Sequence, residues 1–154
     1  MTTRENKLEE AVLSYCLVDT SNLSNALNLF NNQCFMTYSL FWRVLTEYYK
    51  QHKTCPSRKI FEDLSHRHTT LAGICGVYDQ LIKVDVSEGD FDYFTRQLIE
   101  LGLRRQLYVA IDSALDELNT KSSFEVVDIL KRKLVYTSNT TQKEGCLSDL
   151  VSNA

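Results

Sequence analysis

Apolar residues recur at helical spacing along most of the chain, which predicts a run of helices rather than strands. In the N-terminal half, such stripes cover residues 8–19, 21–30, 37–52, 57–64 and 73–82. The widest of them consists of Leu40, Phe41, Val44, Leu45, Tyr48 and Tyr49. We therefore expect a small bundle of short helices in this half.

Local capping signals mark where several of these helices begin. Asn6 followed by Glu9 has the spacing of a capping box, with Asn in place of the usual Ser or Thr, and predicts a helix start at Asn6. Ser21 is the expected N-cap of the second helix. Pro56 ends the widest stripe because the residue before a proline avoids the helical conformation, and Ser57 can cap the helix that follows.

The C-terminal half has the pattern of a helical hairpin. A long helix runs from Asp90 to about Leu118, a polar turn follows, and Ser122 with Glu125 forms the capping box of a second helix. Apolar residues lie on more than one side of the long helix, and an isolated hairpin cannot bury all of them. The pattern therefore predicts self-association, driven by the apolar side chains of Leu103, Leu107, Phe124, Val127 and Leu134.

These elements predict an all-α chain, with a small helical-bundle head followed by a C-terminal antiparallel helical hairpin. We expect the head over residues 1–90 and the hairpin, which mediates dimerisation, over residues 91–137 of the same domain. Residues 138–154 are expected to form a flexible linker and the start of a linker helix. That last apolar pattern begins and stops at once, which suggests that the chain is cut inside a linker.

Composition supports this picture and narrows the location of the protein. The chain has 5 glycines and 1 proline, fewer than the many tight turns of a strand-rich fold would need. Its net charge of -3 argues against phosphate binding as its only role. The 5 cysteines are scattered, and there is neither a signal peptide nor an apolar run long enough for a membrane span. We expect reduced thiols, no membrane contact and a cytoplasmic location.

No sequence motif for catalysis is evident. The chain lacks the G-x-x-x-x-G-K-[ST] loop that cradles triphosphates and the G-x-G-x-x-G loop of dinucleotide-binding folds. We therefore expect no enzyme activity and no cofactor in this chain. His66 and His68, with His52 and Cys55 upstream, could supply zinc ligands, but two residues apart on a helix they point in different directions. Exposed histidines and cysteines buried as small core residues are the favoured interpretation.

Two further groups are candidate contact residues. The basic clusters are predicted to lie on opposite arms of the hairpin and could touch phosphates, although a solvated helix face is the favoured interpretation. Trp42 and Tyr38 are offset from the main stripe and could form a patch that faces a partner. The basic clusters consist of Arg104 and Arg105, and of Lys131, Arg132 and Lys133.

Several strings between residues 7 and 136 resemble the N-terminal domain of DnaB-family replicative DNA helicases. Residues 8–19 are similar to the opening E-x-x-V-L-G-x-L-L-x-D pattern, and residues 34–45 are similar to the D-F-Y…H-x-x-I-F segment. Tyr93 with residues 101–107 resembles the Y…A-x-x-R-x-L helix. Ser14 and Gly102 depart from the family pattern, because they stand where the family has Gly and Ala.

The resemblance implies a collar domain of a hexameric helicase that is not catalytic by itself. In that family the hairpins pair, three pairs form a collar, and the collar docks a DnaG-type primase. The implied partners are a second copy of this chain, in a dimer or a trimer of dimers, and a primase or other replication protein. Nucleic acid and ATP would be handled by a motor domain absent from this chain, so that the parent would be an ATP-dependent DNA helicase. Two alternatives stay open: a stand-alone regulator that mimics this domain and binds a helicase or primase, and a direct single-stranded DNA-binding protein.

Overall fold

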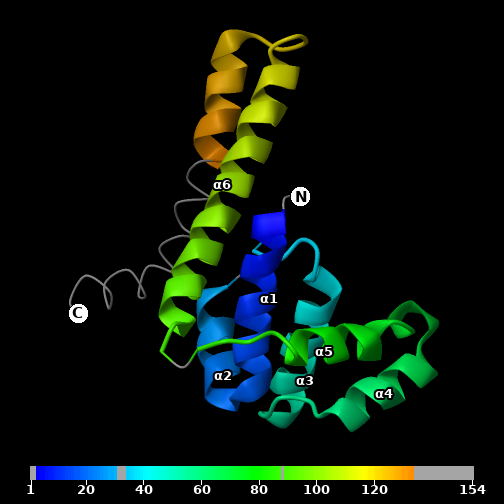
Figure 1. Ribbon diagram of the computed structural model, residues 1–154. Helices are drawn as coiled ribbons and strands as arrows, with labels where there is room; N and C mark the ends of the chain where they lie inside the picture. Colours follow the sequence, from blue (N-terminus) through cyan, green and yellow to red (C-terminus); the bar gives the residue numbers. More distant parts are fainter. Residues whose placement is uncertain (1–2, 31–33, 88, 134–154) are drawn as a thin grey trace. The chain divides into compact units, whose positions relative to one another are not determined.

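The computed structural model describes residues 3–30, 34–87 and 89–133. Over these ranges it contains α-helices, one short 3-10 helix and no strand, so the predicted all-α class is confirmed (Figure 1). The chain forms two compact units, residues 1–98 and residues 99–154. Their boundary falls inside one long helix, a few residues after the predicted boundary between residues 90 and 91. The predicted domain limits stay a prediction, and the predicted linker, residues 138–154, lies outside the described residues.

The first unit is built from short helices and the beginning of the long helix. Helix α1 packs against α2 and α5, and α4 packs against α5 (Figure 1). In the described part of the chain, no helix combines the length and apolar character that a membrane span requires. The elements are α1 (Thr3–Val18), α2 (Thr20–Leu29), α3 (Ser39–His52), α4 (Arg58–Arg67), a 3-10 helix (Thr69–Leu71), α5 (Ile74–Ile82) and α6 (Phe91–Glu117).

Aromatic rings fill much of the core of the first unit. The indole of Trp42 stacks on the ring of Phe35 with centroids 4.6 Å apart, and Phe30 meets it edge-on at 6.0 Å. On the other side of α3, Phe41 stacks on Phe61 of α4 at 5.0 Å. Offset and edge-on ring pairs add stability beyond the apolar area that they bury. These contacts join α2, α3 and α4 through a set of buried rings.

A buried carboxylate ties α1 to the turn that precedes α3. Glu9 is fully buried, and its Oε1 accepts hydrogen bonds from the backbone N–H of Met36 (2.9 Å) and Tyr38 (3.2 Å). The side-chain oxygen of Asn6 accepts a hydrogen bond from the hydroxyl of Thr37 at 2.8 Å. The predicted capping box was therefore wrong, because the helix already begins at Thr3 and both side chains serve a turn distant in sequence.

The cap of α2 also differs from the sequence-based expectation. Asp19 is the N-cap, and its carboxylate accepts a hydrogen bond from the backbone N–H of Ser21 at 2.9 Å. An aspartate at this position satisfies a free backbone donor and also interacts favourably with the positive end of the helix dipole. Ser21, the expected cap, lies inside the first turn of the helix.

Replacing Glu9 with Ala should destabilise the first unit. The substitution leaves the N–H groups of Met36 and Tyr38 without their acceptor, and an unsatisfied buried donor costs about 1–3 kcal/mol. We expect the free energy of unfolding, measured by urea titration, to fall by at least that amount. Glu47→Ala is the matched control, since Glu47 is an exposed carboxylate on α3. Equal stability of the two variants would contradict the assigned role of Glu9.

Candidate functional site

The second unit contains a helical hairpin with a narrow internal seam. The rest of α6 and the helical residues 123–133 lie side by side and are joined by a tight turn (Figure 1). Ala110, Ala114 and Val126 are buried, and the small alanine side chains let the two backbones approach closely. In the turn, the hydroxyl of Ser122 accepts a hydrogen bond from the backbone N–H of Glu125 at 3.2 Å. This bond confirms one half of the predicted capping box.

Large apolar side chains of the hairpin lie exposed beside this seam. On α6 four of them occur at intervals of three, four and three residues, the spacing of one helical face. On the second helix, two further apolar side chains are exposed three residues apart. The exposed fractions are 70% for Tyr108, 51% for Ile111, 58% for Leu115, 48% for Leu118, 89% for Phe124 and 50% for Val127.

Helical geometry places both sets on one side of the hairpin. At about 100° per residue, the exposed stripe of α6 is centred roughly 100° around the helix axis from Ala110 and Ala114. Phe124 and Val127 are centred about 130° from Val126 in the same sense of increasing residue number. Because the two helices are antiparallel, equal rotations in the same sense bring both sets to the same side. We call Tyr108, Ile111, Leu115, Leu118, Phe124 and Val127 the apolar face.

The predicted self-association residues are divided between this face and the seam. Phe124 and Val127 belong to the apolar face, as their exposure shows. Leu103 and Leu107 are half-buried and lie on the side of α6 that carries Ala110 and Ala114. Leu134 lies outside the described residues.

Sequence reasoning missed Tyr108, Ile111 and Leu115, although their spacing was visible in the sequence. Leu118 follows Ala114 by four residues, so its position also fits the stripe of Ala110 and Ala114. It belongs equally to the second stripe, in which Leu118 follows Leu115 by three residues.

The basic clusters occupy both arms of the hairpin, as their spacing predicted. The guanidinium of Arg104 pairs with Glu100 at 3.2 Å on the surface of α6. The Lys133 ammonium donates a hydrogen bond to the hydroxyl of Ser113 at 2.5 Å, which connects the two arms. Lys131 and Arg132 are exposed, and Arg105 is half-buried.

The expected partner patch of Trp42 and Tyr38 is corrected by the structure. Trp42 is 1% exposed, because its indole is enclosed by the rings of Phe30 and Phe35. Tyr38 is half-buried, and its hydroxyl donates a hydrogen bond to the carboxylate of Glu10 at 2.7 Å. Burial and this bond to a carboxylate raise the pKa of the Tyr38 hydroxyl. Trp42 is therefore a core residue, and Tyr38 holds the turn before α3 to α1.

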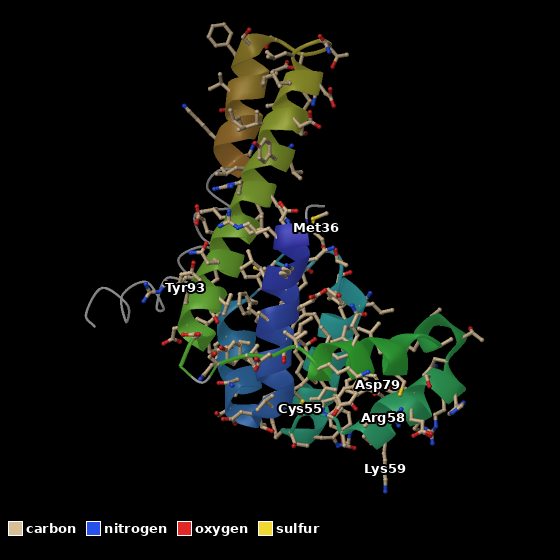
Figure 2. The ribbon with its side chains drawn as sticks, viewed as in Figure 1. Met36, Cys55, Arg58, Lys59, Asp79 and Tyr93 are labelled. Carbon is tan, nitrogen blue, oxygen red and sulfur yellow. The ribbon has the colours of Figure 1, made fainter. Side chains whose placement is uncertain are left out.

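The histidines expected as exposed residues do lie on the surface of the first unit. His66 and His68 are exposed, and His52 packs against the ring of Tyr48 with centroids 4.4 Å apart. Among the described residues, no three His, Cys, Asp or Glu side chains gather as metal ligands would. Arg58 of α4 and Asp79 of α5 point toward each other (Figure 2), with N–O distances of 2.9 and 3.1 Å. This exposed pair fastens two helices together.

The thiols of Cys16 and Cys55 are protected from ionisation. Burial raises the pKa of the Cys16 thiol far above its ordinary value, and the neighbouring Cys55 raises it further. Burial also raises the pKa of Cys55, labelled in Figure 2, to about 11. The thiol of Cys55 donates to the carbonyl of Pro56 at 3.8 Å rather than to a histidine base. A nucleophilic cysteine needs a lowered pKa, so neither environment is that of a catalytic thiol.

No family model, curated protein or solved structure matches the chain.

The thiol environments predict slow chemical modification. With a pKa of about 11, only about one Cys55 in a thousand is ionised at pH 8. We expect iodoacetamide to modify Cys55 slowly at pH 8 and faster as the pH rises toward 10, measured by peptide mass spectrometry. Cys16 should stay unmodified while the protein is folded, and both thiols should react readily in urea. Rapid labelling of Cys55 at pH 7 would show that its thiol is activated.

Proposed function

We propose that this chain is the N-terminal collar domain of a hexameric DnaB-like replicative DNA helicase, from a bacterium or a phage. It holds copies together through the hairpin and docks a DnaG-type primase, and it is not catalytic by itself. The apolar face carries this proposal. Support also comes from the resemblance of residues 8–19 and 34–45 to that family and from the order of a helical head and a hairpin.

The apolar face is large enough to drive association. Complete burial of one such side chain stabilises by about 1.5–3 kcal/mol. Six side chains per copy, each about half exposed or more, would contribute on the order of 10 kcal/mol or more to a dimer. Association costs roughly 4–15 kcal/mol in lost rigid-body freedom, so burial of the face is of the size needed for a stable pair.

The primase-docking part of the proposal rests on the resemblance and is tested separately. The helicase-binding domain of a DnaG-type primase, titrated into the chain by calorimetry, should bind the assembled form. A stand-alone regulator would use the same apolar face to bind the N-terminal domain of another helicase. Such a regulator would form a complex with that helicase domain in preference to its own dimer. Sedimentation of an equimolar mixture of the chain and the helicase domain distinguishes the two outcomes.

A charge introduced into the apolar face should abolish self-association. Leu115→Glu places a carboxylate in the middle of the face, where pairing would bury it without a partner. We expect wild-type chain to sediment as a dimer or larger at tens of micromolar, and Leu115→Glu to sediment as a monomer with unchanged helicity by circular dichroism.

Val109→Glu is the matched control for this experiment. Val109 is also apolar, 70% exposed and on α6, but the helical rotation places it on the opposite side from the apolar face. This variant should sediment like the wild type. A wild-type chain that stays monomeric at high concentration, or equal effects of the two variants, would contradict the proposal.

A further inference from the structure

Charges of opposite sign occupy the two halves of the hairpin. The half that includes the turn, residues 112–128, is acidic, and its one lysine, Lys121, pairs with Glu117 at 3.9 Å. The other half is basic, because it carries both basic clusters, and Lys133 reaches across from the second helix to Ser113 of α6. The exposed acids of the turn half are Asp112, Asp116, Glu125 and Asp128, and the cations of the basic half are Arg104, Arg105, Lys131, Arg132 and Lys133.

We infer that two copies of this chain pair through their apolar faces with the hairpins antiparallel. The inference rests on the proposed function and adds the direction of the pair. In a parallel pair each half would meet its own charge, acid against acid and base against base. In an antiparallel pair the acidic half of each copy lies against the basic half of the other. Opposite charges that flank an apolar contact favour the orientation of the two copies that pairs them, and like charges disfavour the other orientation.

The spacing of the apolar face fits an antiparallel register. With the symmetry axis at Ile111, each Ile111 meets its equivalent, and Tyr108 of one copy lies opposite Leu115 of the other. Arg104, which precedes Tyr108 by four residues, then lies near Leu118 of the second copy, at the acidic end. The sign of the charge changes close to Ile111, so that the apolar and electrostatic patterns share one centre.

The acidic half also makes a second copy the best-fitting occupant of this face. Nucleic acid would bring phosphates against Asp112 and Asp128, which lie next to the face on the two helices. A second hairpin would instead cover the face with its own apolar side chains and place the cations of its basic half beside these carboxylates.

Paired charge reversals test the orientation. One variant reverses the basic half (Arg104→Glu with Lys131→Glu), a second reverses the acidic half (Asp112→Lys with Asp128→Lys), and a third carries all four changes. At low salt, we expect each double variant to weaken self-association by about tenfold or more, because like charges then face each other across the interface. The quadruple variant should recover to within about threefold of the wild type, since opposite charges face each other again.

A parallel pair would give different results. It already places like charges together, so that the double variants would associate as well as the wild type, and this result would overturn the inference. A second measurement uses Lys121 in the turn, which an antiparallel pair separates from its equivalent by about 30 Å. A mixture of isotope-labelled and unlabelled chains, treated with a short lysine-reactive cross-linker, should then give no Lys121–Lys121 link between copies.

The failure of the inference is distinguishable from the failure of the proposed function. A dimer that is insensitive to both double reversals, or that yields the Lys121–Lys121 link, refutes the antiparallel direction while self-association stands. A wild-type chain that is monomeric under all conditions refutes the proposed function itself. Circular dichroism of each variant confirms that the helices are intact, so that lost association is not lost folding.

Discussion

The hairpin can bury only one seam, and this constraint governs the properties of the second unit. Each of two packed helices turns one side toward the other, and here that side carries small residues, Ala110 and Ala114, against Val126. The larger side chains stand about a quarter turn away, where the described hairpin offers no cover. Exposing them in water is costly, and covering them with a second molecule recovers that cost. The proposed association would thus follow directly from the positions of small and large residues along α6.

The first unit buries a core of aromatic rings within itself, although Val18, Met36 and Tyr93 stay exposed. The rings of Phe30 and Phe35 enclose Trp42, and Phe61 lies between Phe41 and Tyr78. Its exposed surface includes the Arg58–Asp79 pair, which lies open to solvent and fastens α4 to α5. The first unit therefore has a buried aromatic core of its own, whereas the hairpin leaves its apolar face exposed.

Helical period and short-range caps made much of the fold predictable from sequence. The spacing of apolar residues predicted the helices, and Ser122 predicted the start of the second hairpin helix. Contacts between distant residues could not be predicted in this way. Glu9 fitted a local capping pattern, yet its partners lie 27 and 29 residues further along the chain. Trp42 resembled a surface anchor because nothing in the sequence shows that Phe30 and Phe35 close over it.

The candidate site was predicted in part, for a related reason. A 3.6-residue period identifies apolar positions but does not say which stripe faces the neighbouring helix. Ala110 and Ala114 decide which stripe packs in the seam, because their small side chains permit close packing. Leu103 and Leu107 were predicted as association residues because their side chains are large and apolar. Tyr108 was overlooked because its hydroxyl makes it resemble an ordinary surface residue.

Glu9 accepts its hydrogen bonds from backbone N–H groups, which every amino acid except proline possesses. The turn at residues 36–38 can therefore keep its shape while the side chains of Met36 and Thr37 change in the course of evolution. Met36 is 55% exposed, so the surface that it offers is free to adapt while α3 keeps its starting point. In related chains, we expect the acidic residue on α1 and the backbone geometry of the turn to vary less than the amino acids of the turn.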